Sequence, residues 1–229
     1  MHREGQYVMG QVIGEFLTNA LGVAISPMPL IMLLVILFTD RARVNAMAFT
    51  AGWMVGLLAL LGIIVWLNVQ PRTGAPTSFN GWINVGLGVL FLILAHSSWR
   101  SRPRPGHPAK QPGWLSSIQT AKPGTVFGVG AAILVLNAKN APLIIASGLA
   151  ITGADLSTSE NIVLMLVFAV LGALSALIIT GAFLAFGSKV EGPLQSLRAW
   201  LEANNAYIMA LLFAFLAYSS LGKGLQILT

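Results

Sequence analysis

Long apolar segments separated by short polar stretches are the feature that most restricts the fold of this 229-residue chain. Each of six segments is long enough to cross a hydrocarbon core, which takes about 20 mostly apolar residues in a helix. They lie at Met9–Phe38, Val44–Asn68, Phe79–Trp99, Thr125–Ile151, Ile162–Phe186 and Ala206–Ile227. Helices are required, because the unpaired backbone groups of open strands are too costly in lipid. The sequence therefore predicts an all-α integral membrane protein with six transmembrane helices.

The composition agrees with a membrane protein and argues against an enzyme. Hydrophobic residues make up 56% of the chain, charged residues only 9%, and the mean hydropathy is +0.80, whereas a soluble domain carries about 25% charged residues. The absence of cysteine excludes disulfides, thiol relays and cysteine-ligated metals. The three histidines lack metal-ligand spacing, and no hydrolase or ATPase signature is present. We expect no catalytic residues, no cofactor and no metal site.

The basic residues predict the orientation of the chain in the membrane. Nine Lys and Arg residues fall in the loops after the first, third and fifth segments, against three in the N-terminus, the other loops and the C-terminus. The nine are Arg41, Arg43, Arg100, Arg102, Arg104, Lys110, Lys122, Lys189 and Arg198, and the three are Arg3, Arg72 and Lys223. Because positive loops stay on the cytoplasmic side, both termini are predicted to be extracytoplasmic. The same rule explains the net charge of +6, so no nucleic-acid partner is expected.

The chain is predicted to divide into two halves. Residues 100–123, rich in Pro and Arg, form a cytoplasmic linker between a three-helix unit at 1–99 and another at 124–229. Related halves with three crossings each must have opposite orientations, and Pro29-Leu30-Ile31 is echoed 113 residues later by Pro142-Leu143-Ile144. We therefore expect two inverted three-helix repeats. The stretch 187–205 is either an amphipathic surface helix or a plain connector.

Two prolines predict a break within the first segment. Pro27 and Pro29, which follow Ser26, each remove a backbone donor and crowd the preceding turn. The freed carbonyls need a partner from protein or from a water-filled cavity. The break is either part of a binding region or a kink that shapes helix packing.

The corresponding place in the second half contains a lysine. Lys139 lies about 21 Å into a core of about 30 Å, so its charge needs a polar interior. It is alternatively a snorkelling side chain, or an ion-pair partner of Glu15 or Asp40. In a cavity its ammonium would attract a carboxylate or phosphate. The candidate substrate-binding residues are Ser26, Pro27, Pro29, Asn137, Lys139, Asn140 and Pro142.

Small and aromatic residues have structural interpretations. Glycines four residues apart let helices approach closely, and the closely spaced pairs are Gly52 and Gly56, Gly124 and Gly128, and Gly86 and Gly88. Tryptophans gather at membrane interfaces, and that position is predicted for most of the set Trp53, Trp66, Trp82, Trp99 and Trp114.

Several motifs resemble a known family. These are the run 21–29, Leu-Gly-Val-Ala-Ile-Ser-Pro-Met-Pro, the link 39–46, Thr-Asp-Arg-Ala-Arg-Val-Asn-Ala, and the later Ala51-Gly52-Trp53. They resemble the peptidoglycolipid-addressing (GAP), or sulfolipid-addressing, family of the lysine exporter (LysE) superfamily. The segment 137–140, Asn-Ala-Lys-Asn, is similar to the family's Asn-Pro-Lys-Asn pattern, with Ala138 in place of proline. The resemblance covers nearly the whole chain.

The resemblance implies a lysine exporter-like fold of two inverted repeats, and a role in moving lipids or small solutes out of bacterial cells across the inner membrane. Asp40, Arg41 and Arg43 in the matching link are candidates for a cytoplasmic gate or loop. The leading hypothesis is a transporter that exports a lipid-linked or anionic amphiphilic molecule.

Two alternatives stand beside it: a proton-coupled exporter of a small amino-acid-like solute, and a non-transporting accessory subunit of a lipid synthesis or export complex. The partners considered are the lipid bilayer, a lipid or anionic small-molecule substrate, a second copy of the chain and an export complex.

Overall fold

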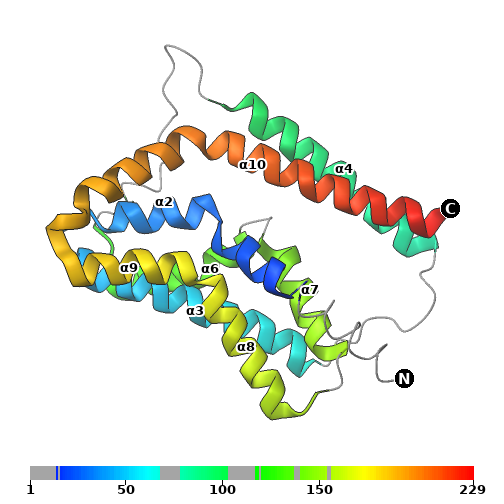
Figure 1. The fold of residues 1–229 in the computed structure, drawn as a ribbon, viewed down its shortest axis with the longest axis horizontal. Helices are drawn as coiled ribbons and strands as arrows, with labels where there is room; N and C mark the ends of the chain where they lie inside the picture. The colour runs from blue at the N-terminus through cyan, green and yellow to red at the C-terminus, as the bar shows by residue number, and fades with distance from the viewer. Residues whose placement is uncertain are drawn as a thin grey trace. The chain divides into compact units, whose positions relative to one another are not determined.

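The computed structural model describes residues 14, 16–67, 78–102, 117–118, 120–136, 140–153 and 156–229, and these contain helices and no strand, as predicted (Figure 1). A helical segment, Phe16–Ala24, precedes the first labelled helix. The labelled helices are α2 (Pro27–Ile36), α3 (Ala42–Trp66), α4 (Ser78–Arg100), α6 (Pro123–Leu136), α7 (Asn140–Gly153), α8 (Thr158–Gly172), α9 (Leu174–Phe186) and α10 (Glu191–Leu228), with a 3-10 turn η1 (Gly187–Val190) before α10.

The chain forms two compact units. The first comprises residues 1–71 and 112–195, and the second comprises residues 72–111 and 196–229. The predicted division into 1–99, 100–123 and 124–229 stays a prediction, because compactness does not test whether two halves are related.

Membrane-crossing length is reached by some of the described helices but not by others. The helix Ala42–Trp66 and the helical run Leu174–Leu228 are each long and apolar enough to cross, and the bent pair Phe16–Ala24 and Pro27–Ile36 makes a third if it is one span. Helices α6 and α7 have 14 residues each, so each is about 21 Å long and shorter than a core of about 30 Å. The predicted fourth segment therefore contains two helices that are each too short to cross the core, and the total of six crossings stays a prediction.

The predicted proline break in the first segment is confirmed. The segment Phe16–Ala24 and α2 meet at a bend of 42°, and Pro27 and Pro29 lie in the first turn of α2, where their missing N–H groups cost no helical hydrogen bond. Helix α7 is built in the same way, since Pro142 is its third residue just as Pro29 is the third residue of α2. The two helices begin 113 residues apart, the spacing of the repeated Pro-Leu-Ile.

Glycines bring α3 and α6 into backbone contact in the first unit. A methyl group added at Gly52 would lie 2.1 Å from the carbonyl oxygen of Phe127, and one at Gly130 would lie 2.4 Å from the carbonyl oxygen of Phe49. Gly56 similarly abuts Ala131. The packing role predicted for Gly52 and Gly56 is therefore confirmed, because no larger residue fits at either position.

Other glycines behave differently from the prediction. Gly124, Gly128 and Gly86 would place an added methyl group in open space, so the packing role predicted for them is wrong. The α6 glycine that contacts α3 is Gly130 instead. Glycines four residues apart lie on the same face of a helix, but their spacing does not show whether that face packs against another helix.

Loops predicted to lie on one side of the membrane meet at one end of the first unit. The Nδ2 atom of Asn45 donates to the carbonyl of Ala121 at 3.2 Å, and the Arg43 guanidinium lies beside Gly187. These contacts join the turns that follow the first, third and fifth predicted segments.

Contacts further along α3 join it to α7 and α8. Ile64, near the end of α3, meets Gly148 of α7, and Gly62 approaches Met165 of α8. The order of crossings stays a prediction, because residues 68–77 between the second and third predicted segments lie outside the described residues.

The fourth loop ends in a helix cap that depends on charge. Ser157 and Glu160 form a capping box at the start of α8, with the Ser157 backbone N–H donating to Glu160 Oε2 at 2.9 Å. The hydrogen bonds from the Ser157 side chain and backbone lower the pKa of the exposed Glu160 carboxyl below its usual 4.5. The cap is therefore complete at pH values above the usual pKa of a glutamate carboxyl. It is lost as the pH falls through the lowered pKa and Glu160 is protonated.

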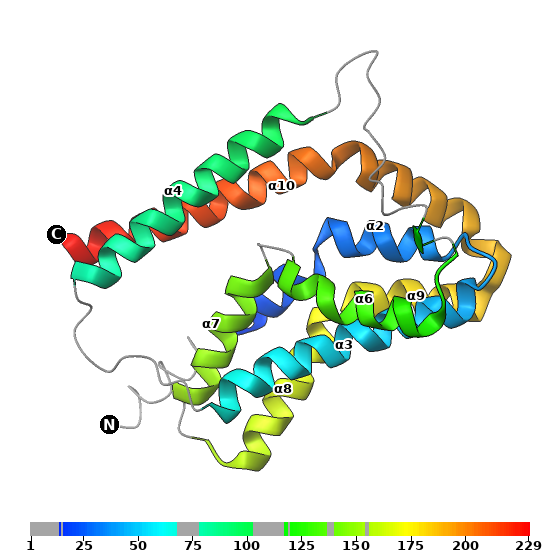
Figure 2. The same ribbon diagram turned by 180° about the vertical axis from the view of Figure 1, so that it is seen from behind.

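The second unit pairs α4 with the later part of α10, which run side by side in both views (Figures 1 and 2). An added methyl group at Gly88 would meet Leu221, and one at Gly224 would lie 2.9 Å from the carbonyl oxygen of Gly81. The rings of Phe91 and Phe213 stack with centroids 6.2 Å apart. Glycine therefore sets the distance between the two helices, and aromatic packing fills the remaining contact.

The described structure favours one of the two alternatives predicted for residues 187–205. The stretch is helical, as η1 and the beginning of α10, so the amphipathic helix is favoured over a plain connector. Leu194 and Leu201 are buried, whereas Trp200 is exposed. The helix continues without interruption into the predicted last crossing, and α10 has 38 residues in all.

The contact between α3 and α6 predicts opposite effects of alanine at two glycines. Gly52→Ala should destabilise the protein by about 1–3 kcal/mol, because the methyl group overlaps the Phe127 carbonyl. Gly128→Ala, in α6 but facing open space, should be neutral or stabilise by up to about 1 kcal/mol through the higher helix propensity of alanine. Thermal unfolding of the two variants in the same detergent measures both effects, and an equal loss in both would contradict the packing assignment.

Candidate functional site

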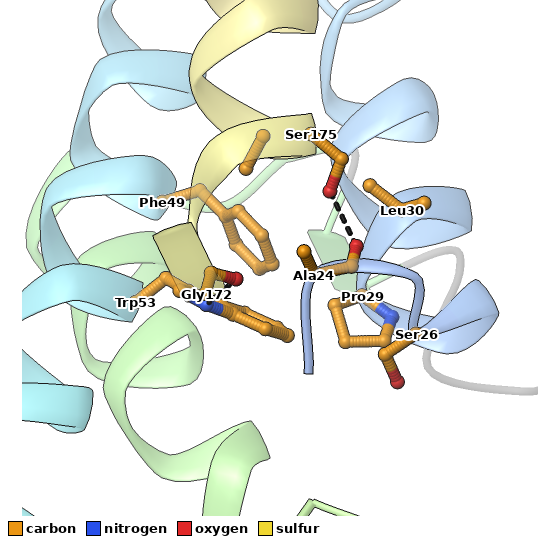
Figure 3. Close-up of a pocket in the computed structure, with 9 residues that line it drawn as sticks. Ala24, Ser26, Pro29, Leu30, Phe49, Trp53, Gly172 and Ser175 are labelled. Atoms are coloured by element: carbon orange, nitrogen blue, oxygen red, sulfur yellow. Dashed lines mark hydrogen bonds between the residues drawn. The ribbon is translucent and has the colours of Figure 1, made fainter. Parts of the chain in front are cut away.

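A small cavity in the first unit lies where two helix breaks meet (Figure 3). The first break separates Phe16–Ala24 from α2, and the second separates α8 from α9 at Ala173. Helix α3 closes the cavity with Phe49 and Trp53. The residues that line it are Ala24, Ser26, Pro29, Leu30, Phe49, Trp53, Gly172, Ser175 and Ala176.

The carbonyl groups beside both breaks have side-chain partners. The Ser175 hydroxyl donates to the carbonyl of Ala24 at 2.5 Å, at the end of the first broken helix (Figure 3). The Trp53 indole N–H donates to the carbonyl of Gly172 at 3.3 Å, at the end of α8. The partner required by a helix break in lipid is thus supplied by protein at both places.

A buried hydroxyl pair joins the helices that line the cavity. The Thr50 and Thr180 side-chain oxygens lie 2.9 Å apart, and both residues are buried. They connect α3 to α9 within the same unit. With the Trp53 bond, α3 holds both sides of the break at Ala173.

The size of the cavity limits what it can contain in this conformation. The space open to the centre of a water molecule is about 10 Å³, which is about what one water molecule needs. No lining residue is ionisable, and the polar groups that face it are hydroxyl and indole groups. In this conformation the cavity is therefore too small for a lipid headgroup.

The candidate residues of the first half lie together. Ser26 and Pro29 line the cavity. Pro27, which lies between them in the sequence, is also buried. Ser26 is only 1% exposed. The prediction that Ser26, Pro27 and Pro29 form a substrate site stays a prediction, since no ligand contact tests it.

The candidate residues of the second half are only partly described. Asn140 is the first residue of α7 and is fully buried, and neither of its side-chain amide atoms has a hydrogen-bond partner. Pro142 is half-buried, two residues further on. Asn137 and Lys139 lie outside the described residues, so the proposed role of the lysine is untested.

The candidate gate residues lie away from the cavity. Asp40 and Arg41 are exposed on the turn between α2 and α3, and Arg43 is exposed in the first turn of α3. This turn is at the end of the unit where the predicted cytoplasmic loops meet. Their position agrees with a loop role, and a gating role stays a prediction.

Sequence reasoning missed several residues of the site. Trp53 does not have the interfacial position predicted for most of the tryptophans, because its side chain is 3% exposed and lines the cavity. Trp66, Trp82 and Trp99 are exposed, as an interfacial or lipid-facing position requires. Gly172 and Ser175 carried no signal beyond a small and a polar residue in an apolar run. In the described part of the chain, no three His, Asp or Glu side chains gather closely enough to hold a metal ion.

The long apolar helices, and the broken helices whose carbonyl groups are paired within the protein, are those of a membrane protein. The family model of the Sap, sulfolipid-1-addressing protein matches residues 16–226. The chain therefore belongs to this family, and the resemblance seen in the sequence motifs is confirmed. Neither a curated protein nor a solved structure gave a match.

The role of the Trp53 indole in the second break can be measured. Trp53→Phe keeps the aromatic packing but leaves the Gly172 carbonyl without its donor, and this should destabilise the protein by about 1–3 kcal/mol. Trp66→Phe is the matched control, because Trp66 is 83% exposed. Chemical or thermal unfolding in one detergent gives both values, and equal stability of the two variants would show that the indole bond is unimportant.

Proposed function

We propose that this protein is a transporter, and not an enzyme, that moves a lipid-linked or otherwise anionic amphiphilic molecule across the bacterial inner membrane. Membership of a family described as sulfolipid-1-addressing supports a lipid-related cargo. The low charge of the described helices supports a protein whose working surface lies within the bilayer. Helices α2, α6, α7 and α9 contain no Asp, Glu, Lys or Arg.

The observation that carries the proposal is the contact between the broken helices of the two halves. The Asn19 side-chain amide donates to the Ser147 hydroxyl at 3.2 Å, which joins the segment before the first break to α7. Gly22 of the same segment is in contact with Leu143 of α7. Broken helices that meet near the middle of a membrane domain are typical of transporters, because their ends offer polar groups to a substrate.

The arrangement of loops supports the proposed topology. The turns after the first, third and fifth predicted segments meet at one end of the first unit, through the contacts of Asn45 with Ala121 and of Arg43 with Gly187. Helix α2 begins two residues before Pro29, and α7 begins two residues before Pro142. This correspondence supports two inverted repeats. With the basic loops on the cytoplasmic side, this order leaves both termini extracytoplasmic.

Transport should depend on Lys139. We expect Lys139→Ala to abolish export of the cargo, because the proposed anionic group loses its counter-charge in a region of low dielectric constant. Lys189→Ala is the control, since Lys189 is exposed on the η1 turn. Export is measured by comparing the lipid and metabolite contents inside and outside cells that carry each variant in place of the wild-type gene. Normal export by a folded Lys139→Ala protein would contradict the assignment.

A transporter must also open the site that is closed in this conformation. Ser26 is 1% exposed, so Ser26→Cys should react with a membrane-impermeant thiol reagent slowly, at the rate at which the site opens to water. The chain has no other cysteine, and Leu57→Cys, at a fully buried position, is the unreactive control. Reaction at position 26 but not at position 57, measured by mass spectrometry, is expected of a transporter. An accessory scaffold that never opens would leave both unmodified.

A further inference from the structure

The segment before the first break and α7 pack in antiparallel fashion. Asn19 meets Ser147, and Gly22 meets Leu143. Residue numbers therefore rise along the segment Phe16–Ala24 in the direction in which they fall along α7, by about one helical turn between the two contacts. The next turn of this register places Asn140 level with Ile25 and Ser26. Figures 1 and 2 both show the first helical segment lying against α7. The start of α7 is therefore at the height of the first break.

Two helix N-termini face this level. Helix α2, of 10 residues, begins at Pro27, and α7, of 14 residues, begins at Asn140. Since α7 is antiparallel to the segment before the break, α2 and α7 run away from the common level in opposite directions. Each N-terminus carries roughly half a positive charge from its helix dipole, so both positive ends lie at the same level of the unit.

Asn140 provides a second, independent sign of a binding site. It is 0% exposed, and its amide nitrogen and amide oxygen both lack a partner. Other buried polar side chains of this unit are satisfied at least in part, since Thr50 pairs with Thr180 and Asn45 donates to Ala121. A buried amide without partners is destabilising, and such groups are rare unless a ligand or water completes them.

We propose that the N-termini of α2 and α7, together with the Asn140 amide, bind an oxyanion such as a sulfate ester, a phosphate or a carboxylate. The Asn140 Nδ2 donates to the oxyanion, and its Oδ1 accepts from a hydroxyl group or water that accompanies it. A cation is disfavoured, because no acidic side chain is present in Phe16–Ala24, α2 or α7. The inference rests on the proposed function and names the group of the cargo that the broken helices recognise.

The test is equilibrium binding to the purified full-length protein in a nonionic detergent. The probes are radiolabelled inorganic sulfate, hexyl sulfate and the neutral hexyl glucoside. We expect saturable binding of hexyl sulfate, at least tenfold weaker binding by Asn140→Asp, and a change of less than twofold for Asn205→Asp. Asn140→Asp should lose affinity because it places a negative charge against the anion. Asn205→Asp is the control, because it makes the same substitution in the middle of α10.

The outcomes separate the sources of the anion. Binding of both sulfates supports a site for a free or esterified anion, and binding of hexyl sulfate alone supports the headgroup of an amphiphile. Equal binding of hexyl glucoside, absence of any sulfate binding, or binding that Asn140→Asp leaves unchanged would overturn the proposal. If Asn140→Asp fails to fold, Asn140→Leu decides the matter, since it removes the donor without adding charge and should weaken binding at least threefold.

Failure of this inference differs from failure of the proposed function. If sulfate binding depends on Asn140 but deletion of the gene leaves the exported lipids unchanged, the anion site stands and the transport function falls. If export depends on the protein but Asn140→Asp binds sulfate like the wild type, transport stands and this anion site falls.

Discussion

The requirement that every backbone polar group have a partner in an apolar surrounding governs the first unit. A helix that crosses lipid without interruption meets this requirement by itself. Among the described residues the chain is interrupted after Ala24 and after Gly172, and each interruption frees carbonyl groups. Side chains from other helices complete them: Ser175 donates to Ala24, and Trp53 donates to Gly172. The breaks persist because this tertiary contact replaces the missing helical bonds.

Close backbone approach makes these partners available. Gly52 and Gly130 allow α3 and α6 to touch through their main chains, and this fixes α3 in the centre of the unit. From there Trp53 and Thr50 reach the helices on either side of Ala173. Bulkier residues at these glycines would move α3 away and leave the carbonyl at the second break unpaired.

Asn140 contrasts with these satisfied groups. Within one unit, the carbonyls beside the two breaks have donors, whereas the amide at the beginning of α7 has neither donor nor acceptor. The difference suits separate roles: the paired groups hold the broken helices in place, and the unpaired amide remains available for a ligand. Asn140 does not line the small cavity at Ser26, whose size leaves room for about one water molecule in this conformation.

The apolar segments and the first break follow from the amino-acid sequence alone, because both are local: runs of apolar residues specify helices in lipid, and Pro27 and Pro29 remove donors wherever they occur. The break at Ala173 could not be predicted in this way. It has no proline, and it is held by a Trp53 bond that joins residues 119 apart in the chain. The same holds for the faces of the glycines, since Gly128 and Gly130 both lie on α6 and only the second meets α3. Sequence determined where the chain can enter a membrane and where its first helix must break, and tertiary structure decided which distant side chains complete the broken helices, because only packing brings those residues together.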